Sequence, residues 1–306
     1  MDQSFNQAII FQMDTAKKAN LFKNETARTE LRDWYGRFLK KIETPVKREQ
    51  ISTSIGANHV LFAGDESKPP LVVMHAMMSS SAHAVSELWK LTEHFQIIAP
   101  DIPGQSVVGP ELRLPFDDYG SWLNEITEQL GLNSFNLMGI SWGGFVALKY
   151  SLLYPENVKK LAVLVPAGVV RGKVVAGLLK MAIPAISYKM KPNEKRLKRL
   201  IEPIMTTWDD DWSNFMGDMF QNFNPDIRIP PLLSNAELGG IITPSLVIGA
   251  ENDISFPGNA LLERVNKQMQ NVETELIENS RHCPPTTDEF RQWLAGRIGT
   301  FFRDET

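Results

Sequence analysis

Ser141 lies in the segment of the chain with the clearest capacity for chemistry, Gly139-Ile140-Ser141-Trp142-Gly143, which has the spacing G-x-S-x-G. A serine at the tip of a tight strand-to-helix turn can act as a nucleophile, and glycines two residues to either side prevent collisions in such a turn. An apolar strand pattern precedes Ser141 and a helical pattern over residues 145–150 follows it. The sequence therefore predicts a nucleophilic serine rather than a bystander in a glycine-bracketed turn.

His282 is the only histidine that follows Ser141 in the chain. Serine alone is a poor nucleophile and needs a base. Where such partners follow in the order Ser, acid, His, the base comes from the loop after the last strand. His282 follows the predicted strand 272–277, so we predict that it is the base. The alternative is a histidine on a surface loop.

Asp253 follows another predicted strand, 245–249, and is our choice for the acid that holds the base in one tautomer. Glu251 lies only two residues earlier and is the alternative. Either residue could also be a loop carboxylate that faces water.

Two backbone N–H groups are needed to stabilise the tetrahedral intermediate of acyl transfer. We predict that Trp142, directly after the nucleophile, supplies one and that Met77 supplies the other. Met77 lies in the loop that follows the predicted strand 71–75. His75, at the start of this loop, is expected to shape the loop rather than to transfer protons.

Short apolar runs that alternate with helical patterns must position these groups. Several runs are near-continuous Val, Ile and Leu, as in strands that are covered on both faces. The alternation predicts an α/β fold with a mostly parallel central sheet and helices on both faces. The predicted strands are 50–55, 59–63, 71–75, 96–100, 134–140, 161–166, 245–249 and 272–277. The predicted helices include 25–42, 84–94, 119–130, 143–154, 259–269 and 287–302.

One stretch, from about 168 to 240, breaks the alternation with helical patterns interrupted by prolines. We predict a helical lid over the carboxyl ends of the strands, the edge at which open α/β sheets bind ligands. The predicted organisation is an N-terminal helical arm at 1–45, a core at 46–167 and 241–306, and the lid at 168–240.

These residues together resemble the α/β-hydrolase superfamily over roughly residues 45–303. The matching positions are His75-Ala76-Met77, Asp101-Ile102-Pro103-Gly104, the Ser141 segment with Gly144, Asp253 and His282. The opening helix and the run Ser79-Ser80-Ser81 are similar to small bacterial carboxylesterases of the naproxen-esterase kind. The resemblance implies an α/β-hydrolase fold and a Ser-His-Asp acyl-enzyme mechanism without a cofactor, and no metal site is predicted.

We therefore predict hydrolysis of carboxylic esters. Proline iminopeptidases and C–C bond hydrolases use a similar serine and remain alternatives, as does a ligand-binding protein on a hydrolase fold. Three residues depart from the family pattern, which usually has glycine at the positions of Ala76, Ala250 and Arg281. A methyl group at Ala76 would narrow the oxyanion loop, and Arg281 places a charge beside the base in sequence.

The composition restricts the partners. A net charge of −4 gives no basic footprint for nucleic acid. The start of the chain lacks the pattern of a secretory signal, and no run of about 18 apolar residues predicts a membrane span. The single cysteine, Cys283, fits a reducing compartment. We expect a cytoplasmic protein with a small-molecule substrate.

The predicted lid is strongly basic between Arg171 and Arg199. Nine cationic residues oppose Glu194 alone there, a net charge of +8. The simplest interpretation is a solvated face. The functional alternatives are steering of an anionic substrate and docking on an acidic surface.

Overall fold

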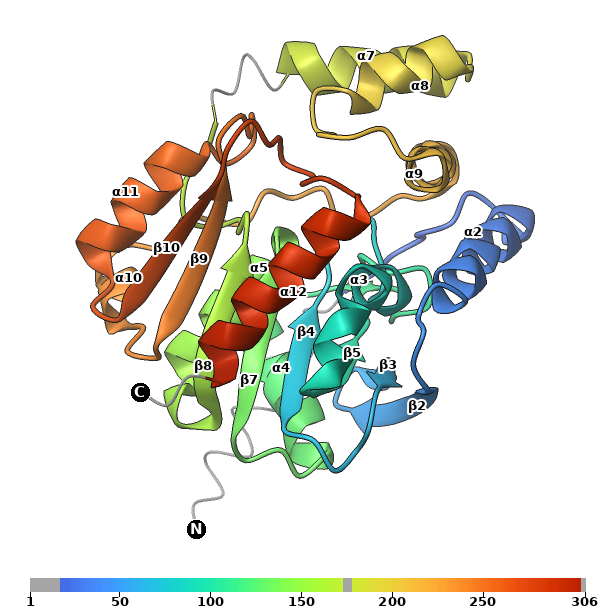
Figure 1. The fold of residues 1–306 in the computed structure, drawn as a ribbon. Coiled ribbons are helices and arrows are strands. Elements are labelled where there is room, and N and C mark those ends of the chain that lie inside the picture. The colour runs from blue at the N-terminus through green and yellow to red at the C-terminus, as the bar shows by residue number, and fades with distance from the viewer. Residues whose placement is uncertain (1–16, 173–177, 304–306) are drawn as a thin grey trace.

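A central sheet of eight strands runs through the structure in the order β10-β9-β8-β7-β4-β5-β3-β2. The computed structural model describes residues 17–172 and 178–303. Neighbours from β10 to β5 pair in parallel, whereas β3 and β2 join the edge as antiparallel strands (Figure 1). The predicted, mostly parallel sheet is therefore confirmed.

Each predicted run corresponds to an observed strand, with bounds that differ by up to four residues. Those of the large sheet are β2 (Val46–Thr53), β3 (Gly56–Ala63), β4 (Pro70–Met74), β5 (Gln96–Pro100), β7 (Phe135–Ile140), β8 (Val158–Leu164), β9 (Ser245–Ala250) and β10 (Val272–Ile277). Two short strands, β1 (Lys17–Lys18) and β6 (Leu112–Arg113), form a separate antiparallel pair.

Helices cover both faces of the sheet, as predicted. One face packs against α3 (Ser81–Leu88) and α12 (Asp288–Arg303). The other face packs against α4 (Asp118–Gln129), α5 (Trp142–Leu153) and α11 (Gly258–Gln268). Two apolar cores result, one on each side, and burial on both faces explains why strands such as β7 and β9 are mostly apolar.

Two predicted helices differ from the observed ones. The predicted helix 25–42 ends earlier, as α2 (Glu25–Leu39), because the following N–H groups close tighter turns, such as that of Lys41 to the Phe38 carbonyl. The predicted helix 84–94 begins earlier, because the Ser80 side chain accepts the His83 N–H and starts α3 at Ser81. It then changes to a 3₁₀-helix, η2 (Trp89–Glu93).

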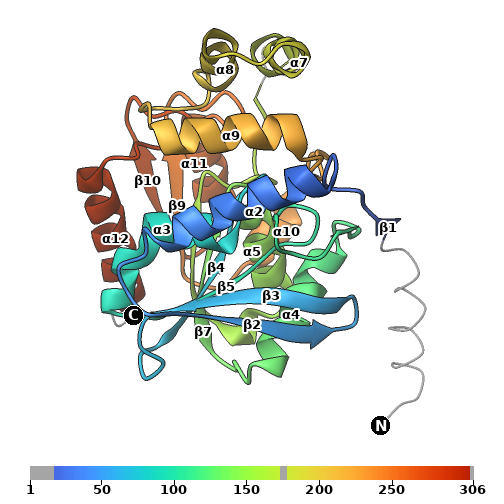
Figure 2. The same cartoon turned by 90° about the vertical axis from the view of Figure 1, so that its right-hand side faces the viewer.

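Three helices lie over the carboxyl ends of the strands (Figures 1 and 2). They are α7 (Ile183–Met190), which continues a π-helical turn η4 (Leu178–Ala182), α8 (Glu194–Ile201) and α9 (Asp210–Asn222). α9 runs beside α2. The last helix of the predicted lid range, α10 (Asn235–Gly240), instead packs against α5 and α11.

The three-part division of the chain stays a prediction. Residues 1–16 of the predicted arm and 173–177 of the predicted lid lie outside the described residues. Of the helices in the described ranges, none combines the length and apolarity needed to cross a bilayer.

Gly143, in the first turn of α5, lies against the end of β4. A Cβ at this position would lie 2.3 Å from the Met74 carbonyl oxygen and 2.4 Å from that of His75. Because these are backbone atoms, they cannot swing aside as a flexible side chain could. The absence of a side chain at Gly143 therefore allows the turn before α5 to lie directly beside the loop that follows β4.

We predict that Gly143→Ala lowers the free energy of unfolding by about 1–3 kcal/mol, the usual effect of overpacking a tight contact. Gly296→Ala in α12 is the matched control, because no heavy atom lies within 4 Å of its added Cβ. This control should raise stability by about 0.5–1 kcal/mol, since alanine favours the helix. Urea unfolding measures both, and equal stability of the two variants would contradict the close contact.

Candidate active site

Ser141 occupies the turn between β7 and α5 in a conformation that side chains rarely adopt, with φ 50° and ψ −111°. The turn is held by backbone hydrogen bonds: the Ser141 N–H donates to the Leu164 carbonyl at 2.9 Å, and the Ser141 carbonyl accepts the Ala167 N–H at 2.9 Å. Strained backbone of this kind persists only where the surroundings over-determine it. The result is a serine whose side chain is not used to cap the helix that it precedes.

His282 and Asp253 complete a chain of hydrogen bonds with Ser141. Ser141 Oγ lies 2.9 Å from His282 Nε2, and His282 Nδ1 lies 2.7 Å from Asp253 Oδ2. The structure thus brings together the three residues that we selected from the sequence, from the ends of β7, β9 and β10. A hydroxyl, an imidazole and a carboxylate in this order can form an activated nucleophile.

The Asp253 side chain is fully buried and has several hydrogen-bond donors. Its Oδ1 accepts the N–H groups of Ser255 at 2.7 Å and Phe256 at 3.0 Å, and its Oδ2 faces His282. Burial would raise the pKa of this carboxyl. The charge of His282 and the hydrogen bonds outweigh burial and lower the pKa below its ordinary value of 3.8. Asp253 is therefore held as a carboxylate.

The pKa of His282 shifts the other way. Burial would lower it, but the Asp253 charge and the hydrogen bond to that carboxylate raise the pKa above the ordinary 6.5. The same hydrogen bond fixes the ring orientation, so that Nε2 faces Ser141. An imidazole held in this orientation can both accept a proton from Ser141 and return it.

Glu251, the alternative acid, has a different partner. Its Oε2 accepts the backbone N–H of Asn279 at 2.8 Å, on the loop that leads from β10 towards His282. The structure therefore places Asp253, and not Glu251, against the imidazole.

Met77 and Trp142, the predicted oxyanion donors, both line the cavity at Ser141. Trp142 is the first residue of α5, so its N–H has no acceptor within the helix. Met77 belongs to a turn in which Met78 has a positive φ of 53°. Their role as donors stays a prediction.

His75 holds the loop that carries Met77. Its Nδ1 lies 2.7 Å from the Ala76 carbonyl oxygen, which it can meet only as a donor, and its Nε2 accepts the Ile102 N–H at 2.8 Å. Burial lowers the pKa of His75, although the nearby Asp101 charge opposes this shift. A neutral ring in this position shapes the loop, as expected from the sequence.

Asp101 has a structural role that we did not predict from the sequence. It is fully buried and interacts with His59 Nδ1 at 2.9 Å, with the Ser81 N–H at 2.9 Å and with the Ser106 hydroxyl. These contacts join the segment after β5 to the start of α3. Ser81, in the serine run after Met77, is thus tied to the scaffold rather than solvated.

A cavity of about 790 Å³ lies between Ser141 and the lid helices. Its walls are mainly apolar and come from both the core and the lid. Five methionines lie in the described part of the lid. Met181, Met205 and Met216 line this cavity, whereas Met219 is buried away from it and Met190 is exposed. Further lid residues in the wall are Ala182, Ala185, Ile204, Trp212 and Phe220.

The charged groups in the cavity wall are mostly paired. Glu87 is the only carboxylate among its described lining residues, and it forms a two-point ion pair with Arg291 at 2.8 and 3.0 Å. Arg228 pairs with Asp226, whereas the Arg171 guanidinium donates to the Pro230 carbonyl at 3.0 Å.

His83 also lines the cavity, and its position was not anticipated. Its Nδ1 lies 2.9 Å from Ser79 Oγ, and its ring packs among Phe38, Trp212 and Phe215. Burial, followed by nearby positive groups, lowers the pKa of His83 to about 3. It is therefore a neutral part of the wall.

The loop that carries His282 is tied to the lid. Cys283 forms a parallel bridge with Met205, in which the Cys283 N–H donates to Ile204 and the Cys283 carbonyl accepts the Thr206 N–H. Arg281 donates from its side chain to the carbonyl oxygens of Glu202 and Met205. The arginine that departs from the family pattern thus turns towards the lid and anchors it.

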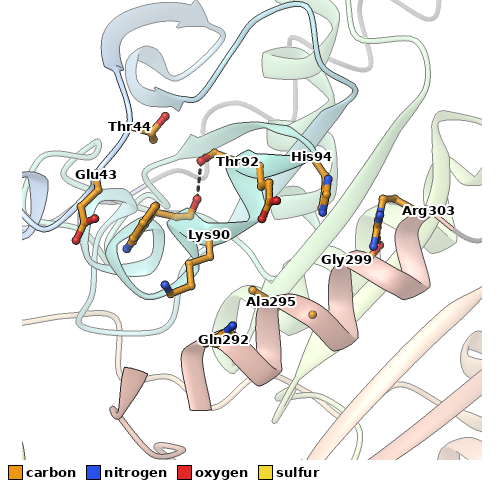
Figure 3. A pocket seen from close by; sticks show the side chains of 12 residues that line it. Glu43, Thr44, Lys90, Thr92, His94, Gln292, Ala295, Gly299 and Arg303 are labelled. Carbon is orange, nitrogen blue, oxygen red and sulfur yellow. Dashed lines mark hydrogen bonds between the residues drawn. The ribbon is translucent and has the colours of Figure 1, made fainter. Parts of the chain in front are cut away.

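A second cavity, of about 600 Å³, lies between η2 and α12 (Figure 3). Its wall includes Glu43, Lys90, His94 and Arg303, and it shares no lining residue with the cavity at Ser141. Among the residues that the structure describes, no group of three or more His, Cys, Asp or Glu side chains could hold a metal ion.

Comparisons with known proteins agree with this arrangement. A family model described as the alpha/beta hydrolase fold matches residues 69–288. The chain is 26% identical over 271 residues to the uncharacterized carboxylesterase nap of Bacillus subtilis (strain 168), covering 84% of this chain and 86% of that protein. It is 22% identical over 257 residues to carboxylesterase YbfK of the same organism, covering 78% and 83%.

Solved structures show the same fold. The crystal structure of naproxen esterase from Bacillus subtilis superposes with a TM-score of 0.77 at 22% identity, covering 90% of this chain and 98% of that one. These matches confirm the predicted resemblance to carboxylesterases of the naproxen-esterase kind. A meta-cleavage product hydrolase from Pseudomonas fluorescens IP01 also superposes, with a TM-score of 0.66 at 18% identity, covering 83% and 97%. Because the family model matches more than half of its length, the chain belongs to the α/β hydrolase fold family.

Proposed function

We propose that the protein is a serine esterase that cleaves a carboxylic ester through an acyl-enzyme intermediate. The observation that carries the proposal is the chain of hydrogen bonds from Ser141 through His282 to Asp253, placed at the wall of an apolar cavity. The positive φ of Ser141 and its place before α5 support the role of a nucleophile elbow.

In the proposed reaction, His282 Nε2 takes the proton of Ser141 Oγ as that oxygen attacks the ester carbonyl carbon. The N–H groups of Met77 and Trp142 stabilise the resulting oxyanion. His282 then gives the proton to the leaving alkoxide oxygen as the C–O bond breaks, which leaves the acyl group on Ser141. Water then attacks the acyl carbon while His282 Nε2 takes one of its protons. As the bond between the acyl carbon and Ser141 Oγ breaks, His282 returns this proton to Ser141 Oγ, and the carboxylic acid is released.

Asp253 supports these steps by remaining ionised. It fixes the tautomer of His282 in which Nδ1 carries the proton, and it stabilises the imidazolium that forms when His282 accepts the second proton. The backbone donors at Ser255 and Phe256 keep the carboxylate in place.

Ester hydrolysis is favoured over the alternatives by two observations. The sequence relatives named above are carboxylesterases. A proline iminopeptidase must bind a free α-amino group, but Glu87, the single carboxylate among the described lining residues, is paired with Arg291. The resemblance to a C–C bond hydrolase rests on the fold alone.

Covalent labelling of Ser141 by a fluorophosphonate distinguishes an enzyme from a binding protein.

The apolar walls favour a bulky hydrophobic acyl or alcohol group in the substrate. An anionic substituent is also part of the proposal, since Arg171 lines the cavity and could receive it. We further propose a cytoplasmic location, which the single cysteine favours.

Ser141→Ala should lower ester hydrolysis by as much as about 10⁶-fold, the scale of such losses in other serine hydrolases. Ser151→Ala is the matched control on the same helix, because the Ser151 hydroxyl is buried and has no hydrogen-bond partner among the described residues. The rate of p-nitrophenyl ester cleavage measures both. Turnover by Ser141→Ala close to that of the control would refute the proposed nucleophile.

Asp253→Asn should lower kcat/KM by about 10⁴-fold, because the amide favours the wrong tautomer of His282. Activity requires neutral His282, so it should fall as pH decreases through the raised pKa, which lies above 6.5 in the wild type. Without the Asp253 charge, the acid limb of the residual activity should move to lower pH. Glu251→Gln should change neither quantity, and an exchange of the two effects would make Glu251 the acid.

A substrate panel should give a higher kcat/KM for p-nitrophenyl esters than for prolyl anilides or vinylogous diketones. Prolyl anilides should be poor substrates, because the described cavity wall offers no free carboxylate to bind their α-amino group. Each rate is corrected by that of Ser141→Ala, so that cleavage outside the site is removed. Faster cleavage of the anilide would favour a peptidase, and faster cleavage of the diketone would favour a C–C bond hydrolase.

A further inference from the structure

Helix α7 presents apolar residues on two opposite sides. On the inner side, Ala185 lines the cavity together with Met181 and Ala182 of the preceding turn. On the outer side, Ile183, Ile186 and Met190 are 55%, 61% and 81% exposed. Their spacing places these three side chains on one face of the helix.

An apolar outer face is unusual for a short surface helix. A helix that is apolar all round is normally buried, and large exposed apolar patches mark interaction sites. α7 and α8 lie at the outer end of the molecule, beyond the carboxyl ends of the strands (Figure 1). The outer face of α7 is therefore exposed at this end of the molecule, without cover from the described residues.

Cationic residues are concentrated in the segment that carries this face. Residues 178–208 contain seven of them, six exposed and Arg196 half-buried, and only two carboxylates, Glu194 and Glu202, a net charge of +5. None of the seven forms an ion pair with a described carboxylate within 4 Å. They are Lys180, Lys189, Lys191, Lys195, Arg196, Lys198 and Arg199. These residues do not line the cavity, so their charge acts outside it.

We propose that α7 and α8 form a docking surface for a lipid bilayer that carries anionic headgroups. Apolar side chains that enter the headgroup boundary, with a rim of lysine and arginine, are the two features by which short helices bind such surfaces. An acidic protein would match the charge but would not require three adjacent apolar side chains on an exposed helix face.

α7 and the turn before it also form part of the cavity wall, through Met181, Ala182 and Ala185. Ile227 and Ile229, after α9, are 76% and 66% exposed and also line the cavity. Docking through α7 would thus bring the apolar cavity to a lipid surface, and α7 itself would separate the lipid from Ser141. Binding does not depend on the proposed ester hydrolysis, so the two proposals can be tested separately.

The test uses the full chain carrying Ser141→Ala, so that no lipid is cleaved, in co-sedimentation with phosphatidylcholine vesicles with and without phosphatidylglycerol. We expect binding to the anionic vesicles that weakens with salt. Ile186→Ser with Met190→Ser, and separately Lys189→Gln, Lys191→Gln and Lys195→Gln together, should each reduce binding by more than about tenfold, since each surface lysine contributes a factor of roughly five.

Two matched controls use residues near the amino ends of the strands, at the other end of the sheet from α7 and α8. Ile242→Ser removes another exposed isoleucine, and Lys159→Gln with Lys267→Gln removes other exposed lysines. Both should bind vesicles as the parent does. With Ser141 restored, the isoleucine–methionine variant and the lysine variant should still cleave a dissolved p-nitrophenyl ester, because the substituted residues do not line the cavity.

No binding to anionic vesicles, or equal loss in the control variants, would overturn the proposal. So would a dimer in solution that Ile186→Ser with Met190→Ser converts to a monomer, because the face would then be covered by a second copy. Vesicle binding by a protein that fails to cleave any ester would instead refute only the proposed esterase function.

Discussion

The contact between the start of α5 and the end of β4 is the constraint on which the site depends. Gly143 lets the backbone of the helix lie against the carbonyl groups of Met74 and His75. This contact sets the distance between the turn that carries Ser141 and the loop that carries Met77. A nucleophile and an oxyanion donor from different strands can serve the same substrate atom only if that distance is fixed.

The charge at Asp253 is the second condition, and it is met locally. An unpaired carboxylate in the interior would be strongly destabilising. Here two backbone donors come from residues two and three positions after Asp253, and the imidazole comes from the loop that follows the neighbouring strand β10. The short loop after β9 therefore makes an ionised acid compatible with burial.

The sequence could predict the sheet, most helices and the positions of Ser141, Asp253 and His282. These depend on local apolar periodicity and on the order of residues along the chain, and both can be read directly from the sequence. The sequence favoured Asp253 as the acid but left Glu251 as an alternative, because a two-residue shift along a loop can turn either side chain inward. The lid contacts of Arg281 and the buried interactions of Asp101 join segments far apart in the chain, and no local pattern marks such pairs.

The bridge between Met205 and Cys283 connects the lid to the loop that carries His282, so that the two segments form a single structural unit. Backbone hydrogen bonds flank His282 on one side, and the Arg281 side chain holds the end of α8 on the other. The lid segment therefore cannot be exchanged as an independent module. A graft of a foreign lid would have to carry compatible residues at positions 281 and 283, or the imidazole would lose its alignment with the serine.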